Sequence, residues 1–130
     1  MESLFQQVKR LDLPLGEFAI FGSGPLIVRR IITATNDLDI VCRGAAWDKV
    51  MQIGKTKYLE EHDVTVVTMC DGRISFGTKW GIGNFDVDEL IDSAEIIDGL
   101  PFVRLEHVVS YKMERASTKD MRHIEALKSN

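Results

Sequence analysis

The sequence lacks the features that mark membrane-spanning, secreted or disulfide-stabilised proteins. It has no run of about 18 apolar residues that would cross a bilayer, and residues 1–10 lack the charged and apolar regions of a secretion signal. Its only cysteines, Cys42 and Cys70, both lie in apolar segments, where we expect buried free thiols rather than a disulfide or metal ligands. We therefore expect a cytoplasmic protein without a membrane role.

An excess of positive charge is also missing. The net charge is −4 and the isoelectric point is near 5.3, which argues against binding of nucleic acid through a broad basic face. The three histidines, His62, His107 and His123, lack the spacing of metal ligands, so no zinc site is expected. With 130 residues, 45% of them hydrophobic, the chain fits a single domain over residues 1–130.

What the sequence does contain is a series of short apolar runs separated by helical patterns. Apolar residues at helical spacing predict a helix over residues 4–11. Continuous apolar runs at residues 18–21 and 38–42 are typical of buried strands. Pro25 suits the first position of a helix that continues to residue 32, and a further helix is predicted between Gly44 and Gly54.

The second half of the chain predicts a hairpin, one more strand and two helices. Residues 64–70 and 73–78 flank Asp71 and Gly72, a pair that favours a tight hairpin turn. Alternation over residues 85–90 predicts a strand with Asp86 and Asp88 on one side. Two amphipathic helices follow residue 101. We therefore expect an α/β fold, with a mixed, twisted sheet of about five strands, helices packed on it, and a C-terminal helical hairpin.

Asp37 and Asp39 are the first candidates for chemistry. They stand two residues apart at the start of a predicted strand, so that their side chains project from the same face and converge on one cation. Mg²⁺ accepts one or two protein carboxylates and takes further oxygens from substrate phosphates. The alternative is an acidic pair without function, because such pairs are common in exposed turns.

Gly22 and Ser23 are candidates for holding phosphate. They end one predicted strand and open a helix, an arrangement in which backbone N–H groups bind anions. The alternative is that Gly22 and Gly24 only permit a tight turn. A third carboxylate from an adjacent strand, Asp86 or Asp88, would complete a two-metal site for displacement at phosphorus.

The order of these motifs resembles that of the nucleotidyltransferase superfamily, whose signature is a Gly-Ser turn, a helix, Asp-x-Asp and a later strand aspartate. The stretch from Thr33 to Asp39, and its distance from Gly22, resemble most the branch that includes minimal lincosamide-type nucleotidyltransferases and abortive-infection toxins. The resemblance implies that Asp37, Asp39 and Asp86 bind Mg²⁺, with Asp88 as the alternate third ligand.

The end of the chain adds a second resemblance to this family. Residues 105–120 resemble the family's leucine-rich helix that ends in lysine and is followed by Arg and Lys-Asp. By this resemblance Lys112 and Lys119 contact the triphosphate, whereas Asp120 either takes part or caps the last helix. Two positions depart from the branch, which has a small residue in place of Pro25 and an arginine in place of Thr33.

The leading hypothesis is a Mg²⁺-dependent enzyme that moves a nucleoside monophosphate from a nucleoside triphosphate to an acceptor hydroxyl, with Asp86 assisting loss of the acceptor proton. The acceptor stays open between an antibiotic, an RNA end, a protein and a metabolite. The alternative is a module of the same fold that binds nucleotide, or a partner, without turnover. Because the family's enzymes often carry an additional helical domain, a homodimer or a partner protein would supply the missing part of the acceptor site.

Overall fold

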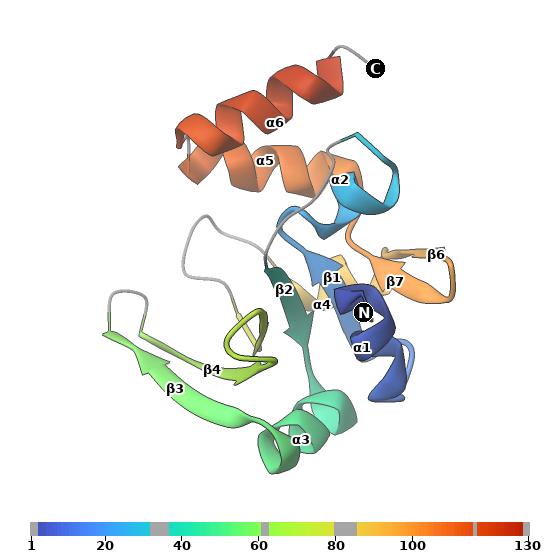
Figure 1. The fold of residues 1–130 in the computed structure, drawn as a ribbon, viewed down its shortest axis with the longest axis vertical. Coiled ribbons are helices and arrows are strands. Elements are labelled where there is room, and N and C mark those ends of the chain that lie inside the picture. The colour runs from blue at the N-terminus through green and yellow to red at the C-terminus, as the bar shows by residue number, and fades with distance from the viewer. Residues whose placement is uncertain (1–2, 32–36, 61–62, 80–85, 116, 129–130) are drawn as a thin grey trace.

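The computed structural model describes residues 3–31, 37–60, 63–79, 86–115 and 117–128, and this part of the chain forms one mixed sheet with helices on both faces (Figure 1). The strand order is β3-β4-β5-β2-β1-β7-β6. The predicted α/β class is confirmed, but the sheet has seven strands within the described residues rather than the expected number of about five. The strands are β1 (Phe18–Phe21), β2 (Leu38–Cys42), β3 (Lys55–Leu59), β4 (Val64–Met69), β5 (Ile74–Gly77), β6 (Glu95–Ile97) and β7 (Leu100–Phe102).

The helices lie mainly where the apolar spacing predicts them. The second helix is shorter than expected, because it ends at Val28 and is followed by Arg30 in a left-handed conformation, with φ 61°. The predicted end of this helix at residue 32, the departure at Thr33 and the start of the predicted strand at Phe85 lie outside the described residues. The helices are α1 (Leu4–Arg10), α2 (Gly24–Val28), α3 (Gly44–Ile53), α4 (Val87–Asp92), α5 (Leu105–Arg115) and α6 (Thr118–Lys128).

The centre of the sheet combines antiparallel and parallel pairs. Strand β1 runs antiparallel to β2 and parallel to β7, while β2 runs parallel to β5. The predicted hairpin is confirmed as β4 and β5, with φ 59° at Asp71 and 81° at Gly72. Because β2 and β5 are parallel, the turn between β4 and β5 lies at the same end of the sheet as the start of β2.

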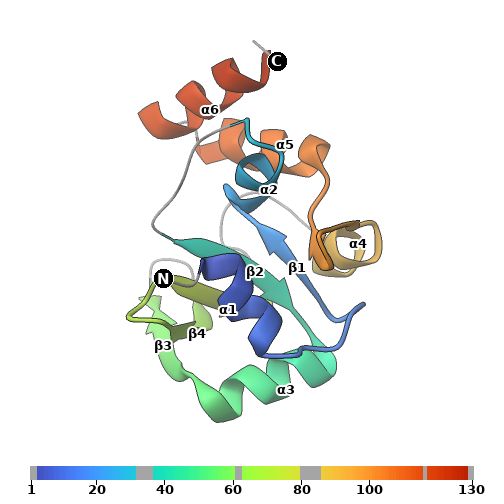
Figure 2. The ribbon, with the colours of Figure 1, turned by 45° about the vertical axis from the view of Figure 1, so that its right-hand side comes forward.

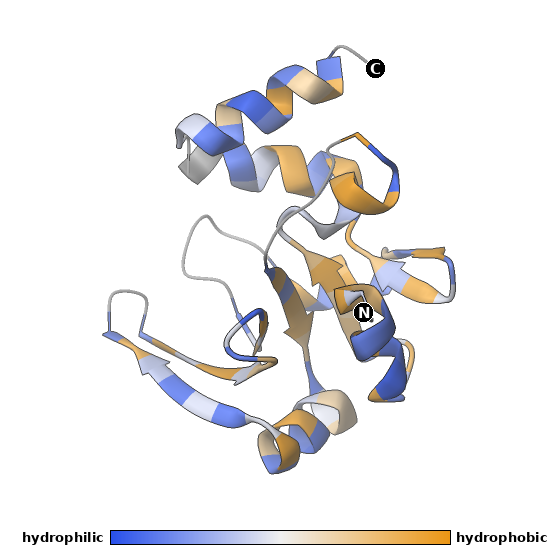
Figure 3. Ribbon diagram, viewed as in Figure 1, coloured by the Kyte–Doolittle hydropathy of each residue, from blue (hydrophilic) through white to orange (hydrophobic). Residues whose placement is uncertain are grey.

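The edges of the sheet were not predicted. Strand β3 is exposed along most of its length and, among the described strands, pairs with β4 alone. Figure 3 shows it mostly blue and white, whereas β1 and β2 are mainly orange. At the other edge, β6 and β7 form a second hairpin around Asp98 and Gly99, with φ 52° and 81°.

The strand predicted over residues 85–90 is wrong, because this segment begins helix α4. Asp86 is the N-cap, and its Oδ1 accepts hydrogen bonds from the backbone N–H groups of Asp88 (3.0 Å) and Glu89 (3.4 Å). Acidic residues in the first turn also suit the positive end of the helix dipole. Leu90 and Ile91 are then buried against the sheet.

Two apolar clusters cover the two faces of the sheet. On one face, Val8 of α1 and Val50 of α3 pack against Ile40. On the other face, residues of α2, α4 and α5 pack against Val41. Figures 1 and 2 show α5 and α6 side by side at one end of the molecule, as predicted for the end of the chain, with α3 at the opposite end. Among the described helices, none combines the length and apolar character needed to cross a bilayer.

Candidate functional site

The turn after β1 brings the backbone close to a carboxylate of β2. Gly22 has φ 62°, which residues with a side chain adopt at a cost. A Cβ atom at this position would lie 2.9 Å from Oδ2 of Asp39. Glycine is therefore required here both by the backbone conformation and by the close approach of Asp39.

Asp37 and Asp39 lie at the start of β2, next to this turn. Asp39 pairs in register with Phe21, the last residue of β1, and its side chain is partly buried. Asp37 directly precedes β2 and is exposed. Leu38 and Ile40 belong to the cluster under α1 and α3. Because side chains alternate along a strand, Asp39 lies on the opposite face, which α2, α4 and α5 cover.

Lys112 connects α5 with the same turn. Its side chain is fully buried, and its Nζ donates a hydrogen bond to Oγ of Ser23 over 3.2 Å. The same Nζ lies 3.5 Å from Oδ1 of Asp120, which is also fully buried. A buried ammonium requires a partner of opposite charge. The structure therefore places Lys112 beside Ser23, as a buried residue that is held by Asp120.

Asp120 also stabilises the beginning of α6. Its Oδ2 accepts hydrogen bonds from the backbone N–H of Ser117 (3.2 Å) and from Oγ of Ser117 (2.6 Å). The N–H of Asp120 in turn donates to Oγ of Ser117 over 3.1 Å, which completes a reciprocal cap. The predicted capping role of Asp120 is confirmed, and the same carboxylate is the anionic partner of Lys112.

Lys119 has a different environment from Lys112. It lies in the first turn of α6 and its side chain is exposed. Its predicted contact with a triphosphate stays a prediction.

The structure does not bring the proposed third carboxylate to Asp37 and Asp39. Asp86 caps α4, and Oδ1 of Asp88 accepts from Nη1 of Arg43 over 2.7 Å. Arg43 follows β2, so Asp88 is held at the opposite end of this strand from Asp37. Within the described residues, no three His, Cys, Asp or Glu side chains are grouped so that they could hold a metal ion.

Arg43 is the centre of an ion-pair cluster that the sequence did not predict. Besides Asp88, it pairs with Asp92 (2.6 Å) and with Glu17 (3.3 Å). Asp92 and Asp88 raise the pKa of the Arg43 side chain, mainly through their hydrogen bonds with it. The cluster ties α4 to the segments before β1 and after β2.

Two hydroxyl residues in line with Asp39 across the sheet were not predicted either. In the sheet, Asp39 pairs with Ser75 of β5, and Ser75 pairs with Thr68 of β4. Side chains of residues in register project from the same face, so Asp39, Ser75 and Thr68 form a polar row. All three are partly exposed, whereas Val41, Gly77 and Val66 in the next such row are buried. This polar row depends on the register of β2 and β5, which cannot be read from one sequence.

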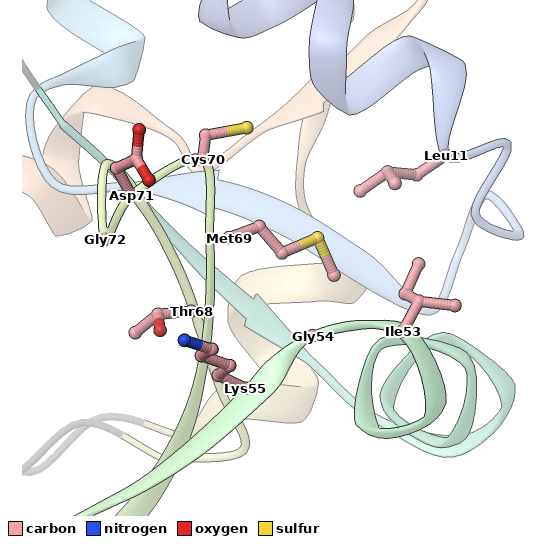
Figure 4. A pocket seen from close by; sticks show the side chains of 9 residues that line it. All are labelled: Leu11, Ile53, Gly54, Lys55, Thr68, Met69, Cys70, Asp71 and Gly72. Carbon is pink, nitrogen blue, oxygen red and sulfur yellow. The ribbon is translucent and has the colours of Figure 1, made fainter.

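A separate pocket of about 510 Å³ lies on the α1 and α3 side of the sheet (Figure 4). It is bordered by the apolar side chains of Leu11, Ile53 and Met69 and by the turn at Cys70. Cys70 is exposed, so its predicted burial is wrong, and its thiol donates to Oε1 of Gln7. Cys42 is buried as expected, and burial raises its thiol pKa to about 12.

Comparison with known proteins adds no relative. No family model, curated protein or solved structure matches this chain. The resemblance to nucleotidyltransferases therefore stays a prediction from the motifs, and the function is proposed from the motifs and the geometry of the site.

Proposed function

We propose that this chain binds a nucleoside triphosphate with Mg²⁺ at the Gly22–Ser23 turn and at Asp37 and Asp39, and that it transfers the nucleoside monophosphate to an acceptor hydroxyl. The observation that carries the proposal is the convergence of three chain segments at one turn. Asp39 lies against Gly22, and Lys112 donates to Ser23. These are residues that the motif pattern selects for metal and phosphate binding.

The two carboxylates fit Mg²⁺ that is shared with phosphate oxygens. Mg²⁺ usually takes one or two protein carboxylates and completes its shell with waters and substrate phosphates. When bound, the cation offsets the negative charge that develops on the phosphoryl oxygens. Asp39 is partly buried beside the turn, where a carboxylate orients a cation more firmly than in open solvent.

The turn and Lys112 supply the phosphate side of the site. The close approach of Gly22 leaves no side chain between the backbone and Asp39. The ammonium of Lys112 orients the hydroxyl of Ser23, which is partly exposed and available to a phosphate oxygen. In the transfer, the acceptor oxygen forms a bond to the α-phosphorus, the bond from that phosphorus to the bridging oxygen breaks, pyrophosphate leaves, and the acceptor proton passes to water.

A second candidate is a module that binds Mg²⁺ and nucleotide without turnover. It is favoured by the positions of Asp86 and Asp88, since one caps α4 and the other pairs with Arg43. Without a third carboxylate near the acceptor, activation of the acceptor hydroxyl is weaker. The two candidates share the nucleotide site and differ only in the transfer step.

The test measures binding first and transfer second. Isothermal titration with the four nucleoside triphosphates, with and without Mg²⁺, is carried out on the wild type and on the double variant Asp37→Asn with Asp39→Asn. Asp98→Asn is the matched control, because Asp98 is exposed in the turn between β6 and β7. We expect Mg²⁺-dependent binding that only the double variant loses.

Absence of binding to every triphosphate, in protein with a native circular dichroism spectrum, would refute the proposal. Where binding is found, release of pyrophosphate is followed in the presence of candidate acceptors: RNA, aminoglycoside and lincosamide antibiotics, protein and free sugars. Release that depends on an acceptor supports the transferase. Binding without release for every acceptor supports the module.

A further inference from the structure

We infer that this site holds one divalent cation, which binds together with the nucleotide, and not a pair of cations. The inference rests on the proposed function and names the metal content of that same site. It follows from what stands beside Asp39 in the sheet, where a carboxylate able to share a second cation would have to lie.

The two positions that flank Asp39 in the sheet carry no charge. On one side Asp39 pairs with Phe21 of β1, and on the other side with Ser75 of β5. Neighbouring strands are about 4.8 Å apart, so a carboxylate at either position would share a cation with Asp39. Ser75 instead offers a neutral hydroxyl, and the next residue along the row is Thr68.

The aspartates that the sequence suggested as a third ligand are engaged elsewhere. Asp86 accepts hydrogen bonds from two backbone N–H groups at the start of α4. Asp88 pairs with Arg43 beyond the other end of β2. In addition, the two segments that precede Asp37 and Asp86 in the sequence, residues 32–36 and 80–85, contain no Asp or Glu at all. Among the described residues, no third carboxylate is therefore grouped with Asp37 and Asp39.

The negative charge of two carboxylates balances the charge of one divalent cation, and no carboxylate charge remains to balance a second cation. Mg²⁺ gives up its waters reluctantly, and its affinity for a protein site depends on the number of charged ligands. The cation alone therefore binds weakly, and phosphate oxygens of the nucleotide supply the missing negative charge. Metal and nucleotide consequently strengthen each other's binding, and by linkage each raises the affinity of the other by the same factor.

The experiment counts bound Mn²⁺, in place of Mg²⁺, by electron paramagnetic resonance. The full chain is titrated with Mn²⁺ alone and then with Mn²⁺ and a nucleoside triphosphate whose α,β-bridging oxygen is replaced by methylene. We expect weak binding of Mn²⁺ alone, and one Mn²⁺ per chain in the presence of the analogue. Two Mn²⁺ per chain with the analogue would overturn the inference. If Asp86→Asn then lost the second Mn²⁺, Asp86 would be identified as one of its ligands.

A substitution at Ser75 tests the same geometry without nucleotide. Ser75→Asp places a third carboxylate beside Asp39, and we expect it to tighten binding of free Mn²⁺ about tenfold, because affinity rises with the charge of the ligands. Ser75→Asn is the matched control and leaves this affinity unchanged, since it adds a similar volume without charge. An unchanged affinity in correctly folded Ser75→Asp would overturn the inference.

The two proposals fail in different ways. If the wild type binds no nucleoside triphosphate, the proposed function fails, while the response of Ser75→Asp to free Mn²⁺ still decides whether Ser75 occupies the place of a third ligand. If nucleotide binds with two cations, the proposed function stands and the single-cation inference fails.

Discussion

The buried pair of Lys112 and Asp120 allows a quantitative test of how α5 and α6 are held to the turn after β1. Both side chains are fully buried, and Nζ of Lys112 lies 3.5 Å from Oδ1 of Asp120. Removing one member leaves the charge of the other buried in the protein, whereas replacing both removes both buried charges. The pair should therefore show strong coupling in a double-mutant cycle.

We expect Asp120→Asn to lower the free energy of unfolding by about 3–5 kcal/mol, because the buried ammonium of Lys112 then loses the negative charge of Asp120. Lys112→Met should cost about 1–3 kcal/mol, less than Asp120→Asn, since the carboxylate keeps both hydrogen bonds from Ser117. The double variant should recover about 2–3 kcal/mol relative to the sum of the single changes.

The assay is urea unfolding followed by circular dichroism. With a denaturant slope of about 1–3 kcal/mol per molar, a loss of about 3 kcal/mol moves the urea midpoint of Asp120→Asn down by about 1–3 M. Ser110→Ala is the control for a helix substitution outside the pair, because the exposed Ser110 hydroxyl donates only to the carbonyl of Glu106 within α5. If the double variant loses as much stability as the two single variants together, the side chains are not coupled, and the assignment of Asp120 as the partner that holds Lys112 is wrong.

Three further predictions concern the turn, the ion-pair cluster and the thiols. Gly22→Ala should lower the free energy of unfolding by about 1–2 kcal/mol, measured by urea titration, because it adds strain at positive φ and crowds the adjacent carboxylate. Arg43→Ala should lower it by about 1–2 kcal/mol, and high salt should shrink this difference, since its three ion pairs are partly exposed; no loss would mean that the cluster does not stabilise α4. At neutral pH, iodoacetamide should label Cys70 in minutes and Cys42 only after unfolding, as peptide mass analysis would show, because Cys42 is buried with a thiol pKa raised to about 12; equal labelling in the native state would contradict the burial.

The central strands could be predicted because their sequences fit few other secondary structures. Residues 18–21 and 38–42 are short and mainly apolar, so they are found as β1 and β2, with the helices α1 and α3 beside them. The turn at Asp71–Gly72 was recognised from its chemistry. The same pair of residues at Asp98–Gly99 makes the turn between β6 and β7, and its strands were overlooked because each is only three residues long.

Two errors have clear physical reasons. Strand β3 lies at the edge of the sheet with exposed side chains, so its sequence has no apolar pattern to mark it. Over residues 85–90, four residues of alternation suggested a strand, but Asp86 with Glu89 three residues later is a signal for a helix start, and two apolar residues follow. Because an N-cap carboxylate turns toward the N–H groups of its own helix, this signal in the sequence argues against Asp86 as a third metal ligand.

Only part of the candidate site could be predicted from the sequence. Its motif residues Gly22, Ser23 and Asp39 could be selected from spacing, and Lys112 from the resemblance. The contact of Lys112 with Ser23, and the position of Ser75 beside Asp39, depend on how distant segments meet. Such contacts depend on strand register and on helix docking, and neither can be read from a single sequence.

The strand order also determines how this chain reaches its folded state. Strand β1 lies between β2, its near neighbour in the sequence, and β7, where Ile20 pairs with Phe102 across most of the chain. Contacts of such long range slow folding, because a large loop must close before they form. Until β7 arrives, one edge of the wholly apolar β1 is open to pairing with other molecules. Recovery of native protein from denaturant should therefore fall as the protein concentration rises, with β1 as the segment through which chains associate.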